Sequence, residues 1–146
     1  MKLTTKMRYG TRALLELALN DGEAPISLKE IAGRQCVSPK YLEQLLAALQ
    51  SAGLVTASRG ARGGYALARS PAQINLRQIY DILEGGEGFV DCTGNPESCD
   101  RSATCVTKQI WSEMHQASMA VLEKTTLAHL AQQARQKQRA PLMYYI

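Results

Sequence analysis

The stretch that decides the fold runs from residue 53 to residue 65 and reads Gly-Leu-Val-Thr-Ala-Ser-Arg-Gly-Ala-Arg-Gly-Gly-Tyr. A short β-branched run leads into a glycine-rich turn, and a second apolar run follows, so the pattern predicts a β-hairpin over residues 54–68. Glycines let a backbone approach another surface closely, and arginine side chains suit phosphate or a narrow minor groove. The tip of the hairpin therefore holds candidate DNA contacts, which are Arg59, Arg62, Gly63 and Gly64.

The residues before the hairpin predict a helix-turn-helix. Ser27 and Glu30 have the spacing of a capping box and begin a short helix that runs to about residue 35. After a turn at residues 36–37, Ser38 caps a longer helix, which has proline at its first position. Two helices joined by a tight turn and followed by a hairpin form a winged helix, which is usually a DNA reader.

The second of these helices presents two different faces. Its apolar side chains recur at helical spacing and predict a buried stripe, formed by Leu42, Leu45, Leu46 and Leu49. On the opposite face, glutamine can pair with adenine, and glutamate can accept a hydrogen bond from cytosine in the major groove. A plain solvated face is the alternative, but the neighbouring wing favours DNA reading through Ser38, Lys40, Tyr41, Glu43 and Gln44.

Charge is distributed unevenly along the chain of 146 residues. Residues 1–70 contain ten Lys and Arg against five Asp and Glu, whereas residues 71–146 contain seven against eight. A basic half that coincides with the predicted DNA reader is what counterion release from DNA requires. No apolar run is long enough to span a membrane, and no signal-peptide core follows the N-terminus, so we expect a cytoplasmic protein without membrane contact.

Three further helices are predicted, and one of them has the pattern of a dimer contact. Thr4 or Thr5 caps a first helix, and Asn75 caps a helix that is followed by a loop over residues 86–104. On the next helix, which covers about residues 105–124, apolar residues alternate at four and three positions and form a coiled-coil-like seam of Ile110, Met114, Ala117 and Val121. The seam packs either on its own domain or on a partner, and the pairing of helix-turn-helix proteins on two half-sites favours a homodimer.

The expected fold class is therefore mostly α, with a winged helix-turn-helix DNA-binding domain and a long C-terminal dimerisation helix. Residues 1–70 would form the DNA-binding region, and residues 71–104 would form a linking helix and a cysteine loop. Residues 105–146 would form the dimerisation helix and the C-terminal tail.

Three of the four cysteines, Cys92, Cys99 and Cys105, lie in or beside the loop. The loop is rich in turn-forming residues and can fold back so that the thiolates converge. Three thiolates in a reducing compartment suit a soft metal or an iron–sulfur cluster, whereas the tight cysteine pairs typical of zinc sites are absent. Free buried thiols and a thiol–disulfide switch agree equally well with the spacing. We expect the fourth cysteine, Cys36, to be a small buried residue in the helix-turn-helix turn.

Two other classes of function are weaker. An enzyme needs a general base or nucleophile in a pocket, and His115 and His129 stand alone without a carboxylate at a pairing distance, so we expect no enzyme. A small metal-dependent enzyme and a winged helix used for protein contacts remain as alternatives. A protein-contact winged helix would not need two arginines on a glycine-rich tip.

With these elements in place, the chain resembles the winged-helix transcriptional regulator family of IscR, NsrR and CymR, over at least residues 1–125. The most specific matching stretches are Ser38-Pro39-Lys40-Tyr41-Leu42-Glu43-Gln44-Leu45 and the wing Arg59-Gly60-Ala61-Arg62-Gly63-Gly64-Tyr65. Shorter stretches that also match are Arg8-Tyr9-Gly10 and Cys105-Val106-Thr107-Lys108.

This resemblance implies a homodimeric transcription factor that binds a double-stranded DNA operator. It implies that Cys92, Cys99 and Cys105 hold an iron–sulfur cluster, of the 2Fe-2S or 4Fe-4S type, that senses redox state, nitric oxide or iron–sulfur status. It matches Glu43 with a residue linked to operator discrimination and Arg59 with a wing contact in the minor groove. The alternative within the family is a cluster-free regulator of sulfur or cysteine metabolism that responds through thiols or a partner protein.

The chain departs from the family at the fourth cluster ligand. IscR-like members have a histidine three residues after the last cysteine, where this chain has Lys108. NsrR-like members use an aspartate near the N-terminus of the partner subunit, and this chain has Arg8 in that region. The fourth ligand is therefore unassigned, and the nearest oxygen or nitrogen candidates are Asp91, Glu97, Asp100 and His115.

Overall fold

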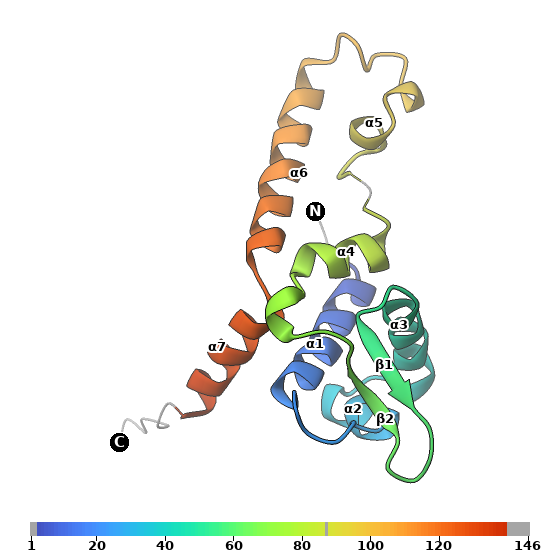
Figure 1. Cartoon of the computed structure of the whole chain (residues 1–146). Helices are drawn as coiled ribbons and strands as arrows, with labels where there is room; N and C mark the ends of the chain where they lie inside the picture. The colour runs from blue at the N-terminus through green and yellow to red at the C-terminus, as the bar shows by residue number, and fades with distance from the viewer. Residues whose placement is uncertain (1–2, 87, 140–146) are drawn as a thin grey trace, which may run out of the picture.

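The structure, a computed structural model, describes residues 3–86 and 88–139 (Figure 1). It begins with α1 (Thr5–Leu19), the helix-turn-helix pair α2 (Leu28–Gln35) and α3 (Pro39–Ser51), and the hairpin β1 (Val55–Ser58) and β2 (Gly64–Leu67). It continues with the 3₁₀ turn η1 (Pro71–Gln73), α4 (Leu76–Glu84), α5 (Asp91–Gly94), η2 (Pro96–Ser98), α6 (Val106–Lys124) and α7 (Leu127–Arg139). This order confirms the predicted mostly α, winged helix-turn-helix fold. Residues 140–146 of the predicted tail lie outside the described residues.

Side-chain caps begin the helices where the sequence predicts them. Ser38 Oγ accepts a hydrogen bond from the Tyr41 amide at 3.2 Å, and Thr4, rather than Thr5, caps α1. The predicted capping box at α2 is only half formed. Ser27 accepts from the Glu30 amide, but the Glu30 side chain turns to the Arg34 guanidinium at 2.6 Å, because an ion pair one turn away competes for the carboxylate.

The predicted hairpin is present and is tied to the preceding chain. The antiparallel strands β1 and β2 pair in a register that runs from Val55 opposite Leu67 to Ser58 opposite Gly64. Tyr65 also exchanges two backbone hydrogen bonds with Ile26, at 2.8 and 3.0 Å. A Cβ atom at position 64 would meet the Ile26 backbone, so the glycine there is needed for this close approach.

The core lies between α1, α3 and α4, and α7 closes it from the side. Leu14, Leu46 and Ile79 are fully buried, and Leu127 of α7 joins the same cluster. The helix α7, which the sequence assigned to the dimerisation unit, therefore packs on α1 of its own chain. The side chain of Leu83 lies where a Cβ at position 10 would stand, so Gly10 lets α1 and α4 pack closely.

One polar group is buried inside the winged helix, and it is fully paired. Gln35 accepts a hydrogen bond from Arg12 Nε at 2.6 Å and donates to Glu16 at 2.6 Å. Because buried polar groups stabilise a fold only when they are satisfied, these bonds hold the end of α2 against α1.

The arm, residues 88–124, extends away from the winged-helix unit (Figure 1). It comprises the cysteine segment, residues 88–105, and α6. The predicted loop over residues 86–104 contains two short turns of helix, α5 and η2. The loop prediction missed them because glycine, asparagine and proline dominate the composition. Here Asn95 caps η2, with proline at its first position.

Candidate nucleic-acid interface and cysteine segment

The outward face of α3 is as predicted. The apolar stripe of this helix is buried, whereas Ser38, Lys40, Glu43 and Gln44 are exposed. Lysine, glutamate and glutamine side chains on one exposed face can reach base edges or phosphates in a major groove. Ser38 has a second role, because its hydroxyl caps the helix and so holds the first turn in place.

Tyr41 differs from its neighbours on α3. It is half-buried, and its ring meets the Tyr9 ring edge-on with the centroids 6.3 Å apart. Its hydroxyl lies 3.2 Å from Thr5 Oγ1, so the side chain points toward α1 rather than away from the protein. Tyr41 was predicted to contact DNA together with its neighbours, because the periodicity of one helix cannot show a contact with another helix.

The wing presents its two arginines to solvent. Arg59 and Arg62 are exposed at the tip between β1 and β2, where long cationic side chains are free to follow a DNA backbone. Gly63 and Gly64 are half-buried and serve the turn itself. A Cβ at position 63 would meet the Ser58 carbonyl oxygen, so the tight tip requires glycine there.

The prediction that Cys36 is buried is wrong. Cys36 is exposed and has φ 53°, ψ 46°, the left-handed conformation that commonly ends a helix. Its amide donates to carbonyl groups of the last turn of α2, and its side chain stands at the end of the helix rather than on the buried face.

The three cysteines of the arm are free thiols. Cys92 is in α5, Cys99 follows η2, and Cys105 is the N-cap residue of α6. Thiolates are the right donor type for an iron–sulfur cluster. However, the described residues contain no group of three His, Cys, Asp or Glu side chains close enough to hold a metal ion. The predicted ligand set is therefore chemically suitable but is not gathered in this conformation.

Cys105 has an environment that favours its thiolate. The hydroxyl of Thr107, 3.2 Å from Sγ, is the main cause that lowers the pKa of the thiol, and the backbone of Lys108 and its positive charge act in the same direction. Lys108 also donates a hydrogen bond to Ser102 and so links the first turn of α6 to the end of the cysteine segment. In the sequence Lys108 is visible only as a departure at the fourth-ligand position, and no local pattern predicts this electrostatic role.

Among the described residues, none of the four candidates for a fourth ligand joins the cysteines in a group that could hold a metal ion. Asp91, Glu97 and Asp100 are exposed. The ring of His115 meets Phe89 edge-on at 5.1 Å, and its Nδ1 is buried without a hydrogen-bond partner. The nine residues from the start of α6 to His115 correspond to about 14 Å of helix, so His115 and Cys105 cannot share one cluster while α6 is intact.

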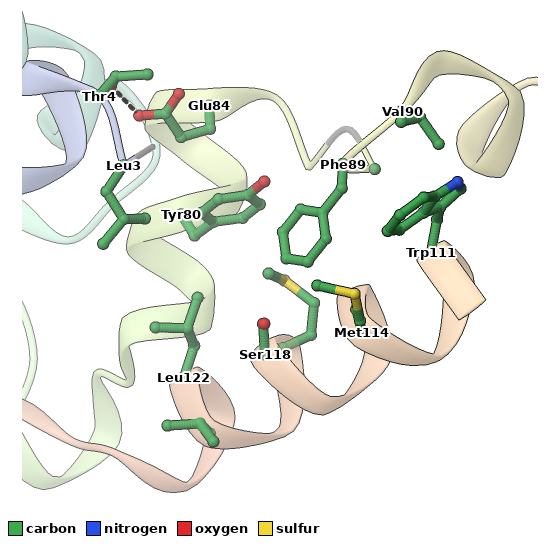
Figure 2. A pocket seen from close by; sticks show the side chains of 13 residues that line it. Leu3, Thr4, Tyr80, Glu84, Phe89, Val90, Trp111, Met114, Ser118 and Leu122 are labelled. Atoms are coloured by element: carbon green, nitrogen blue, oxygen red, sulfur yellow. Dashed lines mark hydrogen bonds between the residues drawn. The ribbon is translucent and has the colours of Figure 1, made fainter. Parts of the chain in front are cut away.

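An apolar cavity of about 610 Å³ lies between α4, α6 and the start of the cysteine segment (Figure 2). Trp111, Met114 and Val121 of α6 form one wall, and Phe89 faces them. Among the described residues, most of the large apolar side chains that remain exposed lie on α6, namely Val106, Ile110, Trp111, Met114 and Val121. The cavity could not be predicted from the sequence, because its walls come from distant segments.

Over residues 3–86 and 88–139 the structure has no helix with the length and apolar character needed to cross a membrane.

Known proteins share this sequence and fold. A family model named Rrf2 and described as an iron-dependent transcriptional regulator matches residues 3–133. Protein rrf2 of Nitratidesulfovibrio vulgaris is 44% identical over 134 residues, which cover 92% of this chain and 89% of that protein. The structure of T. potens IscR has a TM-score of 0.81 and 41% identity, and it covers 97% of this chain and 93% of its own. CymR, the global cysteine regulator of B. subtilis, has a TM-score of 0.76 and 39% identity, with 91% and 98% covered.

Proposed function

The chain belongs to the Rrf2 family of transcriptional regulators, which are not enzymes, and we propose that it reads operator DNA through α3 and the wing. The observation that carries this proposal is the exposed face of Lys40, Glu43 and Gln44 on a helix whose other face is buried. Arg59 and Arg62 would add phosphate or minor-groove contacts. We propose residues 1–70, which include α3 and the wing, as the DNA-binding region.

We propose that the protein binds DNA as a homodimer, with the dimer contact formed by α6. Ile110 and Val121 are 54% and 64% exposed, and apolar surface of this size on one helix of the arm is typical of an interface. A dimer would bind two half-sites about one helical turn apart, ~34–36 Å. Residues 105–124 would thus supply the dimer contact, while α7 stays with the winged helix.

A selection experiment tests DNA reading. Duplexes selected from a random library by the parent protein would define the preferred site, and the same selection would be repeated with Glu43→Ala. We expect the variant to bind a broader set of sequences, because the carboxylate discriminates between bases more than it adds affinity. Glu23→Ala, an exposed glutamate outside α3, is the matched control and should select the parent's site. Identical preferences for parent and Glu43→Ala would remove Glu43 from the reading surface.

For the signal, we propose that Cys92, Cys99 and Cys105 hold an iron–sulfur cluster. The backbone hydrogen bonds described within the cysteine segment join residues three or four apart, so no long-range backbone hydrogen bond opposes a rearrangement that gathers the thiols. The likeness to T. potens IscR supports this choice. When bound, the cluster supplies a chromophore and a group that responds to oxidants or nitric oxide.

The second candidate is a cluster-free regulator that responds through its thiols or a partner protein. The likeness to CymR favours it, and the described residues do not gather the three cysteines into a group that could hold a metal ion. Anaerobic reconstitution with iron and sulfide distinguishes the two. The cluster proposal expects visible absorption that is lost in Cys92→Ser, Cys99→Ser and Cys105→Ser and kept in Cys36→Ser. A colourless, iron-free parent would reject the cluster and support the thiol-based regulator.

A further inference from the structure

Tyr41 lies on the proposed reading helix but makes its contacts inside the protein. Its ring packs edge-on against Tyr9, and its hydroxyl is 3.2 Å from Thr5 Oγ1 in the first turn of α1. Its neighbours Lys40 and Glu43 are exposed, whereas Tyr41 is half-buried. The contact therefore joins the start of the reading helix α3 to the start of α1.

The preceding residue of α1 makes a second long-range contact. Thr4 Oγ1 accepts a hydrogen bond from the Met7 amide and donates one to the Glu84 carboxylate, at one side of the apolar cavity (Figure 2). The first turn of α1 contains no acidic residue of its own, so Glu84 supplies the negative charge that a helix N-terminus attracts.

Glu84 is the last residue of α4 and precedes Gly88, the first residue of the cysteine segment, by four positions. Gly85 and Gly86, at φ 81° and 69°, end the helix in the left-handed region and turn the chain toward that segment. Glu84 is thus the residue of α4 that is nearest in sequence to the cysteine segment.

We propose that the first turn of α1 positions the reading helix α3 through Thr5 and Tyr41, and links that position to the cysteine segment through Thr4 and Glu84. Thr4 and Thr5 are consecutive residues at the start of one helix, so neither contact can shift far without the other. Recognition of bases requires a fixed position of α3, because hydrogen bonds to base edges weaken steeply when distance and angle change. The inference rests on the proposed DNA reading by α3.

A double-mutant cycle in the full-length protein tests the Thr5–Tyr41 link. Affinity for the duplex that the parent selects from a random library is measured by fluorescence anisotropy for Thr5→Val, Tyr41→Phe and the double variant. Each single change should weaken binding by about two- to tenfold, since it removes one hydrogen bond. The double variant should be no weaker than the weaker single variant, because both changes remove the same contact. Thr11→Val, which removes a hydroxyl that contacts only Met7 within α1, should leave affinity unchanged.

Several outcomes of the cycle would overturn the link. If Tyr41 contacts DNA instead, Tyr41→Phe alone weakens binding and Thr5→Val does not. Effects that multiply in the double variant, or silent single variants, also reject it. Circular dichroism and equal unfolding midpoints confirm that each variant folds. A parent that selects no duplex would overturn the proposed function itself, which is a different result.

Reciprocal coupling tests the Thr4–Glu84 link, because two coupled sites must influence each other equally. In a protein whose only cysteine is Cys92, the selected duplex at saturation should change the rate of Cys92 alkylation at least about twofold. Glu84→Ala should abolish the change, and Glu84→Gln, which keeps an acceptor oxygen, should retain part of it. An alkylation rate that DNA leaves unchanged in the parent, or changes equally in Glu84→Ala, would overturn this link.

Discussion

The winged-helix unit and the arm differ in how far each is completed by its own chain. The winged helix buries residues from α1 to α4 and from α7 in one core and pairs its buried glutamine, Gln35. Of the described residues of the arm, only Met119 is buried. The arm leaves apolar side chains and three thiols at its surface. One chain therefore completes the core of the winged helix but leaves large apolar side chains of α6 exposed.

The largest effect, on dimerisation and DNA affinity, is expected when negative charges are introduced into the exposed apolar seam of α6. Ile110→Asp combined with Val121→Asp should produce a monomer, because both side chains are exposed in one chain but would be buried between two. Operator affinity should fall by about 10²–10⁴-fold, since linked half-sites gain that much from effective concentration. Sedimentation and anisotropy measure the two effects.

The control for this change is Gln116→Asp, at an exposed polar position of the same helix. It should remain dimeric and bind as the parent does. A dimeric double variant would show that Ile110 and Val121 do not form the dimer contact.

The next effect concerns folding stability. Leu46→Ala removes a fully buried side chain from the winged helix and should lower the free energy of unfolding by about 2–5 kcal/mol. Val106→Ala, at a position 83% exposed on α6, should change it by no more than about 0.5 kcal/mol. Urea unfolding of both variants measures the difference. Equal losses would show that the arm contributes to the core as strongly as the winged helix does.

A smaller effect distinguishes the two regions by charge. Arg62→Ala on the wing should reduce the slope of log K against log salt by about 1, because one phosphate contact is lost. Arg101→Ala on the arm, also an exposed arginine, should leave the slope unchanged. Titrations at several salt concentrations measure both slopes. A parent-like slope and affinity for Arg62→Ala would place that arginine outside the interface.

The smallest effect concerns the thiol at the end of the cysteine segment. The lowered pKa of Cys105 means that its thiolate persists to lower pH than that of free cysteine. In a protein that retains only Cys105, the pH profile of alkylation should therefore lie below that of free cysteine. Thr107→Val should move the profile upward, because it removes the main stabilising hydrogen bond. Thr104→Val is the control, and coincident profiles for parent and Thr107→Val would reject the assigned cause.

Sequence patterns predicted much of the fold because they report local chemistry. The caps Ser38 and Asn75, the hairpin around the glycine-rich tip and the buried leucine stripe of α3 depend on hydrogen bonds and periodicity within a few residues. The exposed positions of Lys40 and Glu43 follow from the same periodicity. These features could be predicted from the sequence, and the structure confirms them.

Other features depend on contacts between distant parts of the chain, which no local pattern reports. The turn of Tyr41 toward Thr5, the bond between Thr4 and Glu84 and the packing of α7 on α1 join residues 36 to more than 100 positions apart. The spacing of the cysteines could not show whether their sulfurs converge, since a flexible segment satisfies the same spacing in many shapes. The sequence by itself therefore determined the longer helices of the winged-helix unit, the wing and the family. The tertiary structure alone decided which polar side chains link one helix to another, because such contacts result from the packing of distant elements against each other.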